Sequence, residues 1–179
     1  IQAKATVFRD GEYVRAYADA GFVCAPAIRV AHALRAILGP LLARHRLRWV
    51  WLYKAMRGGA QLRSHSDIAA VTVNCWLTPD TANADPRSGG LLIANGSYAR
   101  DEEFSAIRVG YRRNRCVVFP SRLTHTSEPI HFKPGYENHR INVGFFYGDP
   151  VTPMIPIGEG CDLAQCVIDT SRSEFIDSS

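Results

Sequence analysis

The distribution of apolar residues along the chain changes character near residue 48. Before that point, residues 27–48 have a helical composition, with apolar residues near helical spacing and basic residues between them. This pattern predicts an amphipathic helical region that packs one face on a core. Pro26 suits the first turn, and Gly39-Pro40 should end or kink the helix there. After residue 48, short apolar runs alternate with Gly- and Pro-rich turns, which indicates β-strands.

The number and spacing of these runs indicate the fold class. Short strands that follow one helical region predict a mainly β protein with an N-terminal helix, arranged as an antiparallel sandwich or jelly roll. Two polar stretches, residues 78–88 and 96–113, are expected to form the mouth of a site and a lid over it. The runs that predict strands are 48–54, 69–77, 89–93, 115–120 and 140–147.

The length of the chain fits one domain. Its 179 residues, 46% of them hydrophobic and 21% charged, are enough for one core. We expect a helical support over residues 1–47, a β core over 48–148 and a C-terminal tail over 149–179 that wraps the core.

Charge and hydropathy narrow the classes of partner. The formal charge of +4 comes from scattered arginines and one cluster, Arg112, Arg113 and Arg115, so we expect no nucleic-acid partner. No apolar run approaches the roughly 20 residues of a membrane span, and the given sequence does not open on a signal-peptide pattern. These patterns favour a soluble, cytoplasmic protein that does not bind membranes. They do not indicate its oligomeric state.

The cysteines are expected to be free thiols. Their number is odd and they show no CxxC pair or zinc-type spacing. A reducing compartment is consistent with this, and Cys75 and Cys116, inside apolar strands, are predicted as small core residues. The five are Cys24, Cys75, Cys116, Cys161 and Cys166.

Candidate chemistry begins at His65-Ser66-Asp67, directly before the apolar run 69–77. In an extended chain His65 and Asp67 project to the same side. An imidazole and a carboxylate side by side are two members of the 2-His-1-carboxylate triad that binds non-haem Fe(II). The pair is weak evidence alone, because the triad needs a second histidine brought in by the fold. His125, after the strand 115–120, is the first candidate and His131 the alternative.

The other histidines are less suited to this role. His32 and His45 fall on the polar side of the helical region and are predicted to face solvent. His139 is expected to point away from Arg140, which opens the last strand. The period of two places Arg140 and Asn142 on one face of that strand, and a buried guanidinium is costly unless an anion meets it.

Taken together, these motifs resemble those of the Fe(II)/2-oxoglutarate-dependent oxygenases, in the prolyl-hydroxylase-like part of that superfamily. The resemblance implies a double-stranded β-helix, also called a cupin-like jelly roll, with Fe(II) held by His65, Asp67 and His125. It also implies that Arg140 pairs with the distal carboxylate of the cosubstrate 2-oxoglutarate, assisted by Asn142, and that O2 is the oxidant. The likeness covers roughly residues 48–148, through HSD at 65–67, SGGLL at 88–92, VVFPSRLTH at 117–125 and FKPGYENHRINVGFFYG at 132–148.

One departure from the family concerns the distal carboxylate. Many relatives bond it with a tyrosine on the second core strand, where this chain has Trp76. Asn74, two residues earlier on the same face, is the substitute candidate, and Tyr53 on the preceding strand is another cosubstrate contact. For substrate, Gln61 and Arg63 share the face of His65, and Arg122 lies close to His125.

Three functions remain open at this point. The first is a hydroxylase that acts on an unactivated C–H bond of a small molecule, such as an amino acid derivative or another metabolite. Asp67 favours hydroxylation, because the halogenating relatives lack this carboxylate. The second is a hydroxylase of a protein or peptide side chain, of the prolyl type. The third is a non-enzymatic, cupin-like protein that binds a metal or a ligand.

Overall fold

A computed structural model of the chain describes residues 7–22, 24–56, 58–94 and 106–150. Most of the predicted tail, part of the predicted lid, and both Cys161 and Cys166 lie outside the described residues.

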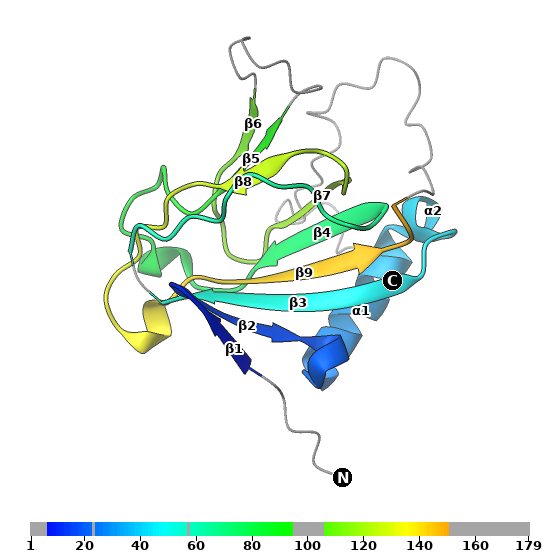
Figure 1. Cartoon of the computed structure of the whole chain (residues 1–179), viewed down its shortest axis with the longest axis horizontal. Coiled ribbons are helices and arrows are strands. Elements are labelled where there is room, and N and C mark those ends of the chain that lie inside the picture. Colours follow the sequence, from blue (N-terminus) through cyan, green and yellow to red (C-terminus); the bar gives the residue numbers. More distant parts are fainter. Residues whose placement is uncertain (1–6, 23, 57, 95–105, 151–179) are drawn as a thin grey trace, which may run out of the picture.

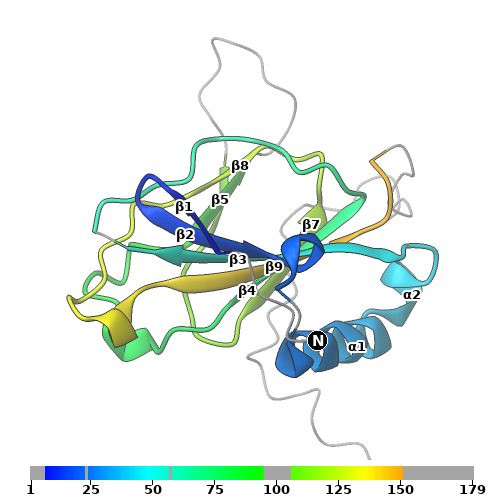
Figure 2. The same ribbon diagram turned by 60° about the horizontal axis from the view of Figure 1, so that its bottom comes forward.

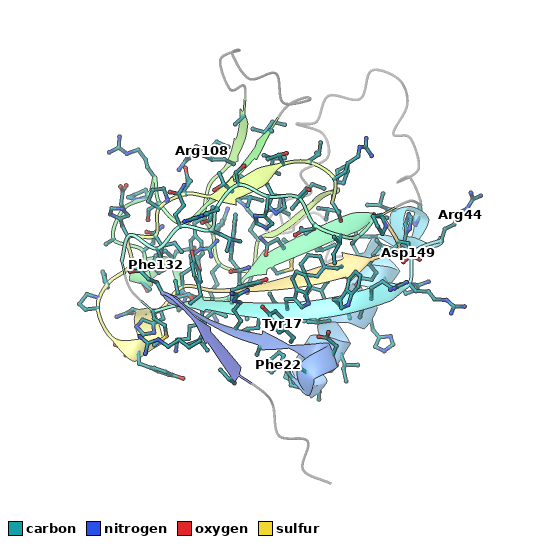
Figure 3. All side chains as sticks on the ribbon, in the orientation of Figure 1. Tyr17, Phe22, Arg44, Arg108, Phe132 and Asp149 are labelled. Carbon is teal, nitrogen blue, oxygen red and sulfur yellow. A yellow bond between two sulfur atoms is a disulfide. The ribbon has the colours of Figure 1, made fainter. Side chains whose placement is uncertain are left out.

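Two antiparallel sheets face each other, and the side chains between them fill the interior (Figures 1 and 3). The prediction of a mainly β jelly roll with an N-terminal helix is therefore confirmed. The large sheet has the order β1 (Val7–Asp10), β2 (Tyr13–Tyr17), β3 (Leu47–Ala55), β9 (Ile141–Tyr147), β4 (Val71–Trp76), β7 (Cys116–Pro120), and the small sheet the order β6 (Ala106–Val109), β5 (Leu91–Ala94), β8 (His125–Ser127). Three short 3-10 helices lie in the connections, namely η1 (Ala18–Ala20), η2 (Asp80–Ala82) and η3 (Tyr136–Asn138).

The helical region covers the outer face of the large sheet. Helix α1 (Ala25–Ile37) begins beside Pro26, and the chain breaks at Gly39 into the short α2 (Gly39–Leu42), as the sequence predicts. The region is shorter than expected, because β3 already begins at Leu47. Figure 2 shows α1 on the side of the large sheet away from β5 and β8. The side chains that α1 and α2 bury in this core include Ala31, Leu34 and Leu42.

Strand periodicity gives the two faces of the large sheet different chemistry. Val73 and Val143 belong to the core cluster that also contains the α1 residues. Asn142, next in sequence to Val143, therefore projects to the inner face, where the register pairs it with Tyr53 of β3 and Trp76 of β4. The inner face of the central strands thus carries polar and aromatic side chains between the two sheets.

Four strands, β1, β2, β6 and β8, were not predicted from the sequence. The hairpin of β1 and β2, turned at Gly11 with a positive φ of 54°, lies within residues 1–47, which were expected to form a helical support. It extends the large sheet beyond β3. Strand β6 lies within the stretch predicted as a loop and lid, 96–113. Charged residues interrupt the apolar runs of β1, β2 and β6, and β8 consists of three polar residues, so no apolar run marks these strands.

The prediction for His45 is wrong. Its side chain is buried, with 1% of its surface exposed, whereas His32 is exposed as expected. Gly148 lies against the ring, and a Cβ there would meet His45 Nδ1 at 2.4 Å. Residues 43–46 are not helical, so the helical periodicity that placed His45 on a polar face does not apply.

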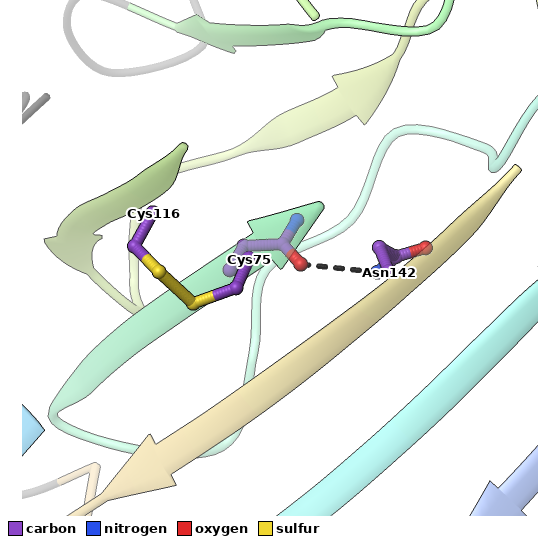
Figure 4. The surroundings of a disulfide bond; sticks show 4 residues. Cys75, Cys116 and Asn142 are labelled. Atoms are coloured by element: carbon purple, nitrogen blue, oxygen red, sulfur yellow. Dashed lines mark hydrogen bonds between the residues drawn. A yellow bond between two sulfur atoms is a disulfide. The ribbon is translucent and has the colours of Figure 1, made fainter. Parts of the chain in front are cut away.

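The prediction that Cys75 and Cys116 are free thiols is also wrong. The two residues are directly opposed partners on β4 and β7, and they form a disulfide with a Cα–Cα distance of 4.1 Å (Figure 4). The pairing depends on the register of two strands 41 positions apart in sequence, which the spacing of the cysteines does not reveal. Cys24 is a free thiol.

Breaking this disulfide should lower stability. We expect the double replacement of Cys75 and Cys116 by Ala to reduce the free energy of unfolding by about 2–4 kcal/mol, because the bridge restricts the unfolded chain. Denaturant unfolding of the variant and of the oxidised parent measures the difference. Cys24→Ala is the matched control and should leave the free energy of unfolding within about 1 kcal/mol of the parent. An unfolding midpoint of the parent that does not respond to reductant would contradict the expectation.

Candidate metal centre

His65 and His125 are held together by their own backbones. Before β4 the chain runs beside β8, and the two residues form an isolated antiparallel bridge. The His65 amide donates to the His125 carbonyl at 3.0 Å, and the His125 amide donates back at 2.8 Å. His125 is the first residue of β8 in the small sheet. The sequence predicts His125 at the end of the strand that became β7, but the turn at residues 121–124 takes the chain across to the other sheet.

Asp67 completes a compact cluster with the two histidines. One ligand atom from each of the three residues lies within 4.8 Å of the others. His65 Nε2 is 3.6 Å from Asp67 Oδ1, and His125 Nε2 is 3.5 Å from Asp67 Oδ2. The side chains of Asp67 and His125 are buried, whereas that of His65 is 37% exposed. The structure therefore brings together the three residues predicted as ligands, while His131 is exposed and not part of the cluster.

The backbone also orients both imidazoles. His65 Nδ1 is 2.7 Å from the Arg63 carbonyl oxygen, and His125 Nδ1 is 2.9 Å from that of Leu123. A carbonyl can only accept, so each Nδ1 carries the proton and each Nε2 keeps its lone pair toward Asp67. Burial lowers the pKa of His125, which favours the neutral, metal-binding form of that ring.

Asp67 is fixed by hydrogen bonds from neighbouring strands. Its amide donates to the Ser121 carbonyl at 2.9 Å, and its Oδ2 accepts from Thr72 Oγ1 at 2.8 Å. The Thr72 hydroxyl also lies 2.8 Å from Ser121 Oγ, and both side chains are buried. Because β4 supplies Thr72 and the turn after β7 supplies Ser121, the large sheet positions the carboxylate.

Replacing Thr72 with Val should lower metal affinity while leaving His65, Asp67 and His125 in place. The side chain keeps its shape but loses the hydroxyl that bonds Asp67 Oδ2, so we expect affinity for a divalent metal to fall about tenfold. Calorimetric titration of the apoprotein with Ni(II) measures this affinity. Thr78→Val is the matched control, since Thr78 is also buried and bonded through its hydroxyl but serves only the backbone near His139. An equal loss of metal affinity in both variants would contradict a specific role for Thr72.

The donor set fits a non-haem metal. Two neutral imidazoles and one carboxylate form the facial arrangement that suits Fe(II) and leaves coordination positions open. His65, Asp67 and His125 offer these three donors from one small region, with both Nε2 atoms facing the carboxylate.

A narrow chamber links His125 to Arg140. The Arg140 side chain is 3% exposed, Nε donates to the Gly89 carbonyl at 2.7 Å, and one terminal nitrogen donates to Asn142 Oδ1 at 3.0 Å. Burial lowers the pKa of Arg140 to about 10. Within the described part of the chain, no carboxylate lies at ion-pair distance from this guanidinium. The chamber is lined by Tyr13, Tyr53, Leu62, Asn74, Leu91, His125, Ser127, Arg140 and Asn142.

Arg140 sets the direction of a chain of hydrogen bonds. A guanidinium only donates, so Asn142 must present its oxygen to Arg140 and its nitrogen elsewhere. Asn142 Nδ2 donates to Asn74 Oδ1 at 3.0 Å, the dashed line in Figure 4. The Asn74 side chain is thereby left with its NH2 donors at the wall of the chamber. Arg140, Asn142 and Asn74, all predicted as cosubstrate contacts, lie in one network.

The two predicted aromatic contacts differ in position. Tyr53 lines the chamber, and burial raises the pKa of its hydroxyl. Trp76 is fully buried and does not line the chamber. The Arg140 Cζ atom lies 5.8 Å from the centre of its ring, and the indole nitrogen has no hydrogen-bond partner among the described residues. Trp76 therefore packs beside Arg140 instead of lining the chamber as a cosubstrate contact would.

Two residues of the chamber were missed by sequence reasoning. Tyr13 comes from the unpredicted strand β2, and its hydroxyl is buried without a partner among the described residues. Ser127 ends β8 and accepts a hydrogen bond from the Leu62 amide at 2.8 Å. The alternation Tyr13, Arg15, Tyr17 is the one signal in the sequence that could have identified β2 as an inward-facing strand.

The predicted substrate residues divide into two groups. Gln61 and Arg63 line a cleft of about 530 Å³ together with His65, as the prediction of a shared face requires. Arg122 is exposed and does not line this cleft. Arg122 lies on the turn at residues 121–124 that joins β7 to β8.

Comparison with known proteins gives a match in structure only. No family model and no curated protein matches the sequence. Similar solved structures include AviO1 from Streptomyces viridochromogenes Tue57, with 19% identity over 83% of this chain and 78% of that chain and a TM-score of 0.58. The non-heme monooxygenase ThoJ, in complex with nickel, aligns at 22% identity over 74% of this chain and 58% of that chain, with a TM-score of 0.54. A Pseudomonas putida prolyl-4-hydroxylase aligns at 20% identity over 75% of this chain and 68% of that chain, with a TM-score of 0.53.

This chain is a double-stranded β-helix. Its large sheet supplies Asn142 and Asn74, and Arg140 directly precedes β9 of that sheet. Strand β8 of the small sheet supplies His125, and the segment beside β8 supplies His65. The cluster of His65, Asp67 and His125 and the chamber beside it therefore lie between the two sheets. None of the described helices is long and apolar enough to cross a membrane.

Proposed function

We propose that this protein is an Fe(II)- and 2-oxoglutarate-dependent oxygenase that hydroxylates a C–H bond of a small molecule. One observation carries the proposal: a buried guanidinium, which has no carboxylate partner among the described residues, shares a narrow chamber with a histidine of the candidate metal centre. The likeness in fold to a non-heme monooxygenase and to a prolyl-4-hydroxylase supports it.

The chemistry of the chamber favours a dicarboxylate. Burying the Arg140 cation costs free energy that an anionic ligand would offset, and a guanidinium binds a carboxylate through two parallel hydrogen bonds. The NH2 group of Asn74 offers a further donor at the same wall. 2-Oxoglutarate carries one carboxylate for this end and a 2-oxo acid group for the metal end.

Each described residue then has a defined task. His65, Asp67 and His125 would hold the metal, with Thr72 and Ser121 keeping the carboxylate in place. When bound, Fe(II) supplies oxidative chemistry in which 2-oxoglutarate and O2 give succinate, CO2 and a hydroxylated product. Arg140 and Asn74 would bind the distal carboxylate. The side chains of Tyr53 and Leu62 line the chamber, and with the cosubstrate in place they would limit the entry of water.

A small molecule is favoured over a peptide by the size of the neighbouring cleft. Its volume of about 530 Å³ falls in the range of small-ligand sites, roughly 300–1,000 Å³. The alternative, a side chain of a protein or peptide, becomes an outcome of the experiment.

The proposal is tested by following succinate release from 2-oxoglutarate while the Fe(II)-loaded protein is incubated with a metabolite panel and, separately, a peptide panel. We expect a metabolite to gain one oxygen atom with matching succinate. Turnover of peptides alone would replace the small-molecule proposal. Absence of succinate in every reaction, together with ligand binding that survives His65→Ala, would favour a non-enzymatic, metal- or ligand-binding protein.

A further inference from the structure

The side chain of Tyr13 reaches the chamber from a hairpin at the edge of the large sheet. Strands β1 and β2 are joined by the two-residue loop Gly11-Glu12, and Gly11 occupies the first position, where tight hairpins favour glycine. The Met56 amide donates to the Glu12 carbonyl at 2.7 Å, which fixes the tip of the hairpin to the end of β3. The hairpin therefore holds Tyr13, the first residue of β2, at a defined level of the sheet (Figure 1).

Tyr13 and Arg140 lie in one row across the inner face of this sheet. The register pairs Tyr13 with Ala55 of β3, and the Ala55 amide donates to the Arg140 carbonyl at 2.9 Å. Residues in one row of an antiparallel sheet project to the same face, about 4.8 Å apart from strand to strand. Because the side chain between them is only the methyl group of Ala55, the phenol and the guanidinium face the chamber together.

The Tyr13 hydroxyl is buried without a hydrogen-bond partner among the described residues. Ser127 also lines the chamber, but its hydroxyl oxygen already accepts from the Leu62 amide at 2.8 Å. Burial raises the pKa of Tyr13, so the phenol keeps its proton at neutral pH and can donate it. A buried hydroxyl without a partner costs free energy, which a ligand that accepts this proton would offset.

The groups that face this part of the chamber are mainly donors. Arg140 uses Nε and one terminal nitrogen in bonds to Gly89 and Asn142, and its other terminal nitrogen makes no hydrogen bond to a described residue. Asn74 presents its NH2 group to the same space. A carboxylate, whose two oxygens accept about four hydrogen bonds, would satisfy these donors and the Tyr13 hydroxyl at once.

We propose that Tyr13 donates a hydrogen bond to the distal carboxylate of 2-oxoglutarate beside Arg140, and that the cosubstrate thereby holds the hairpin of β1 and β2 against the sheet. This inference rests on the proposed function, which places 2-oxoglutarate in the chamber. It goes beyond the resemblance in sequence, which covers roughly residues 48–148 and assigns nothing on the hairpin. A bond from a hydroxyl to a carboxylate is charge-assisted, so it should favour ligands that carry the distal carboxylate.

Replacing Tyr13 with Phe tests the inference, because it removes the hydroxyl and keeps the ring. Calorimetry on the Ni(II) form of the full chain compares 2-oxoglutarate with 2-oxopentanoate, which has a methyl group in place of the distal carboxylate. We expect Tyr13→Phe to lower affinity for 2-oxoglutarate about tenfold and to leave affinity for 2-oxopentanoate unchanged. Hydrogen exchange of the β2 amides should slow when 2-oxoglutarate is added to the parent, and should slow less in Tyr13→Phe.

Tyr111→Phe is the matched control. Tyr111 is half-buried with its ring centre 5.9 Å from the Arg140 Cζ atom, but its hydroxyl donates to the Thr78 carbonyl and it does not line the chamber. Loss of this hydroxyl should lower the thermal midpoint by about 2–4 °C and leave affinity for 2-oxoglutarate unchanged. Tyr13→Phe should not lower the thermal midpoint, because the hydroxyl that it removes bonds no described residue.

Unchanged affinity for 2-oxoglutarate in Tyr13→Phe overturns the inference, and a loss seen in Tyr53→Phe instead would assign the carboxylate to that tyrosine. An equal loss of affinity for both oxo acids also overturns it, because Tyr13 would then act through packing. The proposed function fails separately. A parent protein that binds no 2-oxoglutarate removes the cosubstrate and this inference with it, whereas binding that depends on Tyr13 without succinate formation removes only the oxygenase.

Discussion

Replacing Asp67 with Ala is expected to reduce affinity for a divalent metal by more than about 100-fold and to abolish succinate formation. Loss of a group that only orients a ligand typically costs about 10–100-fold in metal affinity, so loss of the one negatively charged ligand should cost more. Asp67 also accepts the hydrogen bond of the buried Thr72 hydroxyl, so a modest fall in stability should accompany the loss. Calorimetric titration with Ni(II) and a succinate assay with Fe(II) measure the two effects.

Two comparisons separate this effect from misfolding. His65→Ala removes a ligand whose side chain is 37% exposed, so it should lower metal affinity comparably with little change in the thermal midpoint. Asp19→Ala removes an exposed carboxylate from η1 and should change neither property. Full metal affinity in both Asp67→Ala and His65→Ala would mean that the three residues do not form the metal site.

Replacing Arg140 with Met is expected to separate cosubstrate binding from stability. Two charge-assisted hydrogen bonds to a carboxylate contribute enough that 2-oxoglutarate affinity should fall by about two orders of magnitude or more. The free energy of unfolding should change by less than about 2 kcal/mol, because Arg140 pairs with no carboxylate in the described parts of the chain and such a guanidinium stabilises the fold little. Binding of 2-oxoglutarate to the Ni(II) form and denaturant unfolding of the apoprotein give the two quantities.

Arg108→Met is the matched control with the opposite expectation. Arg108 pairs with the buried Glu128 through two hydrogen bonds, so its loss leaves that carboxylate without its guanidinium and should cost about 1–3 kcal/mol of stability. Arg108 does not line the chamber, and 2-oxoglutarate affinity should be unchanged. If Arg140→Met behaves like Arg108→Met, with lost stability and intact affinity, Arg140 is structural and does not bind the cosubstrate.

Some of the residues that the structure brings together could be placed from local patterns, because they come in pairs only two positions apart. His65 and Asp67 are two positions apart, as are Arg140 and Asn142, so strand periodicity alone places each pair. The core strands could also be predicted locally, because each is a continuous run of mostly apolar residues. Residue types in such runs determine which face they occupy, whatever the rest of the chain does.

What the sequence could not provide depends on pairing across the fold. The partner of Cys75 is set by the register of β4 against β7, and the route from β7 to His125 passes between two sheets. Tyr13 enters the chamber because the hairpin of β1 and β2 adds to β3, which no local pattern requires. Trp76 was placed correctly on the inner face, but packing beside Arg140 decides what its indole ring contacts.

The backbone bridge between His65 and His125 also bears on how the protein folds. The two residues are about sixty positions apart, so their reciprocal hydrogen bonds form only after a long loop has closed, at an entropic cost of several kcal/mol. The three candidate ligands then come together in the same folding step that closes the small sheet. A metal that binds them would stabilise the folded state in which this bridge is formed. Hydrogen exchange at the two histidine amides should therefore slow together when metal is added.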